Sequence, residues 1–521
     1  MEDTKKIIDV AIIGGGVSGT YAGWRLKSTP QFKDKNITIF EGSDRIGGRL
    51  LSISQTDVAP NLVAELGGMR FQKNQQSVYN LITHLGMKDD IVNFGSEEDN
   101  NYQYVRGKHY FTRDYNDNPE IIPFKLYPRE RGKTPAQLQY EAIFYIYPEL
   151  KGMSLDKMRE YLKSATFMGN PLWKVGFWNL LLTRLSNEAY QLIREAGGYY
   201  WIISNWNAYD AIPEIVFQYE QPEFYRLKTG FQQLPLKLGS SFEALGGTIQ
   251  FNQTLIKASL VSKDDKPLIK LKTNKEEVLA RRVIFSLPKG AIQGLSDDSF
   301  LFSNKQFNHD LETVTAEPAD KLFMWFDQEW WTGLGISQGA SNTDLPMRQC
   351  YYFGSEDNPE GVCGKSGLLM ATYNDGLAVD FWSGFMPRSK FSYSSQARFE
   401  NRLGYHQNMA PPKAMIHELI HQLSVLHQIK VPDPHTAIYQ NWSWPPFGGG
   451  WHFWNPYNQS WEVIPRIRKP INDVDAYLCG ESYSASQGWV EGAINTTEKV
   501  LEDYFELAFP SWLDNDYNIG P

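Results

Sequence analysis

The chain has 521 residues, which is enough for two or three domains and a large buried core. Its formal net charge is −9 and 21% of its residues are charged, so it offers no basic field to nucleic acid or to an anionic membrane. Cys350, Cys363 and Cys479 lie far apart in the sequence, which favours a reducing compartment without a disulfide framework and leaves a single pair as the alternative.

The first apolar run, residues 7–13, is predicted to be a strand that ends in a glycine-rich turn. Gly14, Gly16 and Gly19 have the G-x-G-x-x-G spacing of a dinucleotide site that opens a helix. The first glycine permits a tight turn, the second lets the backbone approach a pyrophosphate, and the third allows helix and strand to pack closely. The helix N-terminus then faces the phosphates. Taken alone, this spacing also fits a sharp strand-to-helix connection without a ligand.

A second apolar run, residues 36–40, ends at Glu41, whose carboxylate can accept hydrogen bonds from both hydroxyls of an adenosine ribose. An acid at this place disfavours a 2′-phosphate and therefore NADP. The following segment supplies a second glycine pair flanked by Arg45 and Arg49. This combination resembles the second motif of the FAD-dependent amine oxidase superfamily. The resemblance places Arg45, Gly48 and Arg49 along the pyrophosphate and the flavin.

Apolar periodicity predicts the further elements. Helices are predicted at residues 77–86, from 134 to about 207, after 229–235, at 415–426 and from 496 to about 509. Strands are predicted at residues 248–251, 255–261 and 283–287, with strand-like alternation over residues 318–384. Residues 114–118 are predicted to be rich in turns. The aromatic segment 442–461 contains prolines and successive glycines that disfavour regular structure, which indicates a pocket wall.

The resemblance implies the α/β fold class, in a multi-domain chain of the α+β type. We expect a Rossmann-like FAD-binding domain of the glutathione-reductase-2 type, a mixed-sheet substrate domain and a helical insertion. The expected boundaries are 1–72, 226–312 and 460–521 for FAD binding, 73–132 and 313–459 for substrate binding, and 133–225 for the helical part.

Gly67 and Gly68 let the backbone pass close to a planar ring system, and Arg70 then places a guanidinium beside that ring. The planar fork of a guanidinium meets a carboxylate in a bidentate pair, which fixes orientation as well as charge. The Met69-Arg70 pair is similar to the L-amino acid oxidase branch, in which the arginine clamps the substrate α-carboxylate. Monoamine and polyamine oxidases are expected to have no cation there. A structural salt bridge is the alternative role for this arginine.

Two segments near the C-terminus also resemble the family. Residues 477–481 resemble a strand and turn whose acid, here Glu481, touches the ribityl chain or the pyrophosphate. Residues 488–493 resemble the segment that opens the last helix beside the flavin. Trp489 would then form one wall of an aromatic cage and Trp451 the other, with core packing as the alternative for each tryptophan.

Lys321 resembles the family lysine that holds a water against flavin N5, where a cation also stabilises negative charge developing on oxygen. A solvated lysine at a strand end is the alternative. Tyr373 is a second candidate donor to the substrate carboxylate, and Thr372 competes with it because the register of this strand is open.

In monoamine oxidases a cysteine just before the second wall carries the covalent bond to the flavin. Here the nearest cysteine to the wall tryptophans is Cys479, in the predicted strand before Gly480, so the resemblance implies that FAD is held noncovalently. By the same resemblance, the other residues expected around the cofactor are Ser18, Gly42, Met69, Leu255, Trp442, Gly488 and Val490. No metal is expected.

His417, Glu418 and His421 form an H-E-x-x-H pattern, with His427 further on, which defines a rival class of function, a zinc metalloprotease. In that motif a glycine ends the helix, so that the third histidine can reach the metal. Here Ser424 occupies the position of the glycine. On an unbroken helix His417 and His427 lie about 15 Å apart along the axis, too far to share one metal.

The combined pattern is identified as that of an FAD-dependent L-amino acid oxidase of the bacterial type. Such an enzyme converts L-amino acids, O2 and water into 2-oxo acids, ammonia and hydrogen peroxide by hydride transfer from Cα to flavin N5. We expect a broad range that includes large apolar and aromatic side chains, with lysine and arginine left open. A monoamine or polyamine oxidase is the nearest rival, and a binding protein of the same fold, such as a guanine-nucleotide dissociation inhibitor, is a third hypothesis.

The expected partners are therefore free L-amino acids and O2, without nucleic acid or membrane, in a homodimer or a larger homo-oligomer. The N-terminal residues run directly into the first predicted strand and no apolar stretch reaches membrane-spanning length, which favours a cytoplasmic location.

Overall fold

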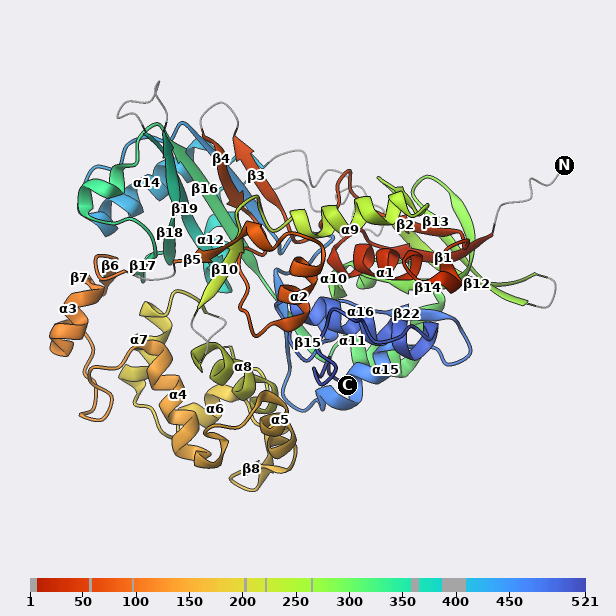
Figure 1. The fold of residues 1–521 in the computed structure, drawn as a ribbon. Helices are drawn as coiled ribbons and strands as arrows, with labels where there is room; N and C mark the ends of the chain where they lie inside the picture. Colours follow the sequence, from red (N-terminus) through yellow and green to blue (C-terminus); the bar gives the residue numbers. More distant parts are fainter. Residues whose placement is uncertain are drawn as a thin grey trace.

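A computed structural model describes residues 7–55, 59–95, 98–200, 204–220, 223–263, 266–357, 365–386 and 409–521. The chain forms two large sheets and a separate cluster of helices (Figure 1). Cys350 and Cys479 are buried free thiols, and Cys363 lies outside the described residues. Within the described ranges, no helix is both long and apolar enough to cross a membrane.

The first sheet has seven strands in the order β11-β2-β1-β14-β13-β12, with β22 paired to β14. The strands β11, β2, β1, β14 and β22 pair in parallel, whereas β12, β13 and β14 pair antiparallel. Their bounds are β1 Ile8–Ile13, β2 Ile37–Phe40, β11 Thr248–Gln250, β12 Leu255–Lys263, β13 Lys266–Thr273, β14 Glu277–Phe285 and β22 Ala476–Leu478.

Both faces of this sheet are covered, which explains why β1 is a nearly continuous apolar run. Val10 and Ile12 pack into one core with three helices, while Ala11 and Ile13 pack into a second core on the opposite face. The three helices are α1 (Val17–Lys27), α9 (Gln233–Ala244) and α16 (Val490–Phe505). They lie side by side in Figure 1, and α1 touches both of the others.

The second sheet has the order β20-β16-β19-β18-β17-β6-β7 and is antiparallel except between β17 and β6. Its bounds are β6 Tyr102–Val105, β7 Lys108–Phe111, β16 Ala319–Phe326, β17 Ala340–Thr343, β18 Gln349–Asp357, β19 Lys365–Asp375 and β20 Thr436–Asn441. Leu322 and Met324 of β16 pack toward α14 (Lys413–His427), whereas Phe323 and Trp325 pack on the other face, toward the hairpin of β3 (Ser52–Gln55) and β4 (Ala59–Glu65).

The helical cluster has its own core and lies below the two sheets in Figure 1. Its helices are α4 Pro135–Ile146, α5 Leu155–Ser164, α6 Phe177–Leu181, α7 Asn187–Ala196 and α8 Ala208–Glu220. The first of them starts at a capping box, in which Thr134 accepts from the backbone of Gln137 and the Gln137 side chain accepts from the backbone of Thr134. The mixed α and β architecture agrees with the predicted fold class, while the domain boundaries stay a prediction.

Several predicted elements were wrong in type or extent. Residues 114–117 of this stretch belong to helix α3 (Thr112–Asp117), at whose start the Asp114 carboxylate accepts from the backbone N–H of Phe111. The strand-like run to residue 384 ends earlier, since Gly376 adopts φ 52° and leads into helix α12 (Leu377–Ser383).

The aromatic segment 442–461 contains the strand β21 (Trp451–Trp454), which pairs with β15 (Val314–Glu317), so part of it is regular structure. The last helix, α16, begins before the predicted Thr496 and ends at Phe505 rather than near residue 509. Its start directly after Trp489 brings an aromatic side chain to the helix N-terminus.

Candidate active site

The glycine turn after β1 lies at one end of a long cavity of about 250 Å³. Gly14 has φ 106°, a left-handed conformation that favours glycine, and a Cβ on Gly19 would lie 1.9 Å from the Gly14 carbonyl oxygen. Gly16 caps α1 without any side-chain hydrogen bond, and the first turn of this helix has no acidic residue. The first-turn amides are therefore available to an anionic group in the cavity, which Gly14, Gly16 and Ser18 line.

Glu41 lines the same cavity at the end of β2. Its Oε2 accepts from the backbone N–H of Gly15 at 2.6 Å, and its Oε1 accepts from the backbone and hydroxyl of Ser43 at 2.8 and 2.7 Å. The carboxylate is thus fixed beside the glycine turn, where a ribose joined to a pyrophosphate would pass.

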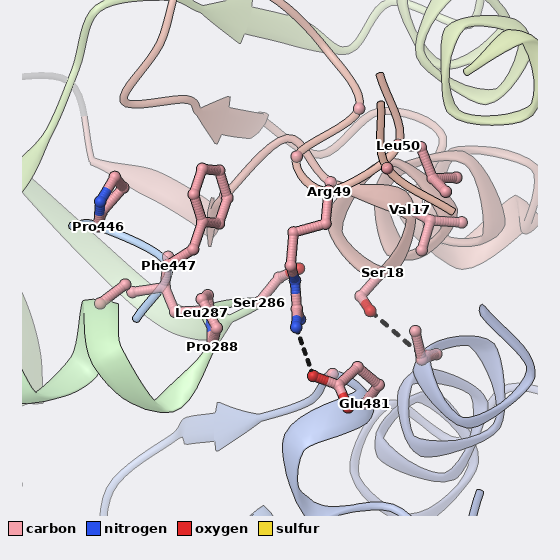
Figure 2. A pocket seen from close by; sticks show the side chains of 18 of the residues that line it. Val17, Ser18, Arg49, Leu50, Ser286, Leu287, Pro288, Pro446, Phe447 and Glu481 are labelled. Atoms are coloured by element: carbon pink, nitrogen blue, oxygen red, sulfur yellow. Dashed lines mark hydrogen bonds and ion pairs between the residues drawn. The ribbon is translucent and has the colours of Figure 1, made fainter. Parts of the chain in front are cut away.

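Figure 2 shows Arg49 crossing the cavity toward Glu481, from which its Nη1 is 2.6 Å away. The same carboxylate oxygen is 2.6 Å from Nδ1 of the buried His452, and the backbone N–H of Gly488 donates to the other oxygen at 3.0 Å. Burial alone would raise the pKa of Glu481, but Arg49 and His452 hold it well below its usual value. Glu481 is therefore ionised and fixes the guanidinium of Arg49 in the cavity.

Arg45 lies differently from its predicted place along the pyrophosphate. Its guanidinium donates to the carbonyl oxygens of Gly48 and Leu50, at 2.6 and 3.1 Å, and the side chain is not among the described residues that line the cavity. Arg45 thus stabilises the loop from which Gly48 and Arg49 line the cavity. The predicted cofactor residues that do line this cavity also include Gly42, Gly67, Gly68, Leu255, Trp442, Gly480 and Val490.

A second cavity of about 210 Å³ joins the first. The two share eight lining residues, namely Gly67, Gly68, Lys321, Tyr373, Trp451, Gly488, Trp489 and Val490. Met69 and Arg70 line only the second cavity. Several residues that the sequence assigned to chemistry thus lie where the first cavity meets the second.

Arg70 is half-buried in the second cavity. Its Cζ lies 4.0 Å from the ring centroid of Phe224, 5.5 Å from that of Phe94 and 5.9 Å from that of Tyr351. No carboxylate of the described chain forms an ion pair with it, so the structural salt bridge considered above is not observed there. The guanidinium thus lies near three aromatic rings and has no ion-pair partner among the described residues.

Lys321 is 2% exposed and donates through Nζ to the main-chain oxygens of Gly67 at 2.6 Å and Glu65 at 3.1 Å. Burial lowers its pKa to about 7. Tyr373 lies opposite it on the β16–β19 ladder, and the lysine Nζ is 4.4 Å from the centroid of that ring. Thr372 is buried and donates to the carbonyl oxygen of Met347, so it is Tyr373 that faces the cavities.

Trp451 and Trp489 both line the junction of the cavities. The indole of Trp489 stacks at 6.3 Å and 15° on Phe224, and its Nε1–H donates to Oε1 of Glu214 at 2.9 Å. The second wall, Trp451, lies 6.5 Å from the ring of Tyr373. The two predicted walls are thus brought to one place by segments far apart in the chain.

Sequence reasoning missed the parts of the second cavity that come from other elements, chiefly Tyr199 and Glu214 of the helical region and the rings around Arg70. One signal was present for Glu214. It is an acid inside the apolar run Ala211-Ile212-Pro213-Glu214-Ile215-Val216 of helix α8. Because an acidic side chain is rarely buried without a partner, its place in this run indicates a specific role.

The H-E-x-x-H pattern lies on α14, which continues as a helix from Lys413 to His427. His427 is buried between the hydroxyl of Tyr352, at 2.6 Å from Nε2, and the carbonyl oxygen of Leu423, at 2.8 Å from Nδ1. Burial lowers the pKa of His427 to about 4. Both of its nitrogens are engaged within the core, and no cluster of three metal-ligating side chains occurs in the described part of the chain.

The comparison with known proteins identifies the class. Residues 17–500 match the flavin containing amine oxidoreductases, and the chain belongs to that family. It is therefore a flavin-dependent amine oxidoreductase with FAD as cofactor. This family membership rules out the metalloprotease and binding-protein hypotheses. The glycine turn, the uncapped start of α1 and the fixed Glu41 fit the phosphates and ribose of this dinucleotide.

Individual relatives are distant but cover nearly the whole chain. Aplysianin-A of Aplysia kurodai is 24% identical over 99% of this chain and 93% of its own length. Achacin of Lissachatina fulica is 25% identical over 96% and 93%, and the L-amino acid oxidase bordonein-L of Crotalus durissus terrificus is 25% identical over 95% and 86%. Among solved structures, putrescine oxidase bound to putrescine aligns with a TM-score of 0.62, 15% identity and coverage of 96% and 100%, which shows a shared fold.

Proposed function

We propose that this enzyme oxidises free L-amino acids with O2, giving 2-oxo acids, ammonia and hydrogen peroxide. The observation that carries the proposal is Arg70, a half-buried guanidinium in the second cavity without a carboxylate partner among the described residues. A simple amine has no anionic group to meet this cation, whereas the α-carboxylate of an amino acid forms a bidentate pair with it. L-amino acid oxidases among the distant relatives support the same substrate class.

Different residues of the chain would bind the substrate, confine its reacting end and stabilise charge during the reaction. Arg70 would bind and orient the substrate carboxylate, and Trp451, Trp489 and Tyr373 would confine the reacting end at the junction of the cavities and exclude water from it. The flavin, when bound, supplies the acceptor for the two electrons of the substrate and passes them to oxygen. Lys321 would lie close to the place where negative charge develops on oxygen, and that charge would favour the ammonium form, whose pKa burial lowers to about 7.

We further propose that FAD is held noncovalently. No cysteine is found among the described residues that line the cofactor cavity, Gly450 precedes Trp451, and Cys479 is 3% exposed outside the lining. Acid precipitation of the purified enzyme should then release all of its flavin into the supernatant, and yellow colour kept in the pellet would contradict this. A homodimer or larger assembly is proposed from the family resemblance alone, and light scattering of the purified protein tests it.

The substrate proposal is tested by peroxide release from the purified enzyme with each L-amino acid, its D-isomer and its decarboxylated amine. We expect L-amino acids to be oxidised, with kcat/KM at least 100-fold above the matched D-isomers and amines. Faster turnover of an amine such as cadaverine or phenethylamine than of lysine or phenylalanine would instead identify an amine oxidase and overturn the proposal.

A further inference from the structure

The second cavity contains a carboxylate as well as a guanidinium. Glu214 is the one Asp or Glu among the described residues that line it, beside the cations Arg70 and Lys321. Its Oε1 accepts from Nε1 of Trp489 and from Nε2 of Gln218, each at 2.9 Å. Its Oε2 has no hydrogen-bond partner in the described structure, and no ion pair involves this residue there.

The position of Glu214 separates it from the reacting end. The residues shared with the cofactor cavity mark where the substrate must meet the flavin, and Glu214 is not one of them. It is instead shared with a third cavity of about 260 Å³, together with Gln75 and Trp489. Glu214 therefore lies outside the junction with the cofactor cavity, where the second and third cavities meet beside Nε1 of Trp489.

No cation among the described residues forms an ion pair with the Glu214 carboxylate. Arg159 lines the third cavity, but its Nη2 donates to the carbonyl oxygen of Ala485 at 2.6 Å rather than to Glu214. Asp210, four residues earlier on α8, accepts from the hydroxyl of Ser460 at 2.7 Å and is not among the described residues that line either cavity. Burial raises the pKa of Glu214, and Arg159 offsets this only in part, so an ionised carboxylate is costly here and a cationic ligand beside it would stabilise the charge.

We propose that Glu214 selects L-amino acids with a cationic side chain, such as lysine and arginine, by accepting a hydrogen bond from the distal ammonium or guanidinium while Arg70 holds the α-carboxylate. Trp206, Phe453 and Trp489 line the same cavity, and their apolar rings suit the methylene chain of such a substrate. This inference rests on the proposed function, and it narrows the broad apolar range expected from the two tryptophan walls.

The test compares substrates that differ only in the distal charge, namely L-lysine with L-norleucine and L-arginine with L-citrulline. In the wild-type holoenzyme we expect kcat/KM to be at least tenfold higher for the charged member of each pair. Glu214→Gln keeps an acceptor for Trp489 but removes the charge, so the lysine to norleucine ratio should fall at least tenfold. Asp210→Asn, the matched control on the same helix face but outside the cavity lining, should change that ratio less than twofold.

A binding measurement does not depend on turnover. 6-Aminohexanoate carries a carboxylate and a distal ammonium but no α-amine, and hexanoate lacks the ammonium. By thermal shift, the wild-type enzyme should bind 6-aminohexanoate at least fivefold more tightly than hexanoate, and Glu214→Gln should remove the difference.

Two outcomes overturn the inference while leaving amino acid oxidation intact. One is a wild-type enzyme that prefers norleucine or citrulline. The other is a Glu214→Gln variant that loses lysine and norleucine oxidation equally, which would mean that Glu214 only positions Trp489 or binds the α-ammonium. Oxidation of cadaverine in preference to lysine would instead overturn the proposed function itself.

Discussion

Substitution of Arg70 separates recognition of the substrate from stability of the fold. Because no carboxylate of the described chain pairs with this guanidinium, Arg70→Ala removes no internal ion pair but leaves the substrate carboxylate without its partner in a partly buried cavity. Loss of one partner of such a pair costs about 2 to 5 kcal/mol, which corresponds to a decrease of kcat/KM by a factor of roughly 30 to 5,000. Arg70→Lys keeps the charge but loses the planar fork and the stacking at 4.0 Å on Phe224, so a smaller loss of about 1.5 to 3 kcal/mol is expected.

The assay is steady-state peroxide release with L-lysine and L-phenylalanine, together with the FAD content and the thermal unfolding midpoint of each variant. Arg70→Met should unfold at the same temperature as the wild type or a higher one, because an unpaired cation in a partly buried site costs stability. Arg226→Ala is the matched control, since Arg226 is half-buried on the same strand as Phe224 but is not among the described lining residues. Retention of kcat/KM within threefold in Arg70→Ala would refute the assignment, as would an equal loss in the control.

The other predictions concern the cofactor, the pH dependence of stability and metal. Glu41→Ala should weaken FAD retention at least tenfold in a flavin-release titration, since its carboxylate fixes the glycine turn as well as facing the ribose site; unchanged retention would contradict this. Burial raises the pKa of Asp320 to about 8, so the folded state keeps a proton that the unfolded chain releases above about pH 4. Between about pH 4 and pH 8, the free energy of unfolding should therefore fall by up to about 1.4 kcal/mol per pH unit because of this group. Asp320→Asn can keep the contacts to Asn374 and Tyr439 and should flatten the fall of the urea midpoint between pH 5 and 8, whereas an unchanged slope would be contrary to the argument. EDTA treatment and His421→Ala should each leave oxidase activity within twofold of the wild type, and stoichiometric zinc in the purified enzyme would count against this expectation.

The sequence was informative where the site is continuous in the chain. The turn from Gly14 to Gly19 and the pair Gly67-Gly68 lie in the cofactor cavity or pack against it, because glycine spacing reports backbone geometry directly. Arg70 was found by its position next to that pair. The role of each of these residues toward FAD or substrate stays a prediction.

The sequence was uninformative where distant elements meet. Glu214 comes from α8, and Phe224 from β10 (Phe224–Leu227), and their approach to Arg70 and Trp489 depends on tertiary packing that local periodicity does not encode. Arg45 shows a different limit. Its residue type and spacing predict a phosphate contact, whereas its guanidinium donates to the carbonyl oxygens of Gly48 and Leu50 in the structure, and local sequence does not encode which acceptors a side chain reaches.

The cofactor-binding sheet joins strands from both ends of the chain, since β1 and β2 lie beside β14, which in turn pairs with β22. Glu481 and the start of α16 close the same cavity from the last part of the sequence. During translation, the early strands leave the ribosome long before these partners exist, so the nascent chain has no complete FAD pocket. Capture of the flavin must therefore wait until residues 490–493 have emerged, and a chain whose synthesis stops earlier lacks part of the cavity wall.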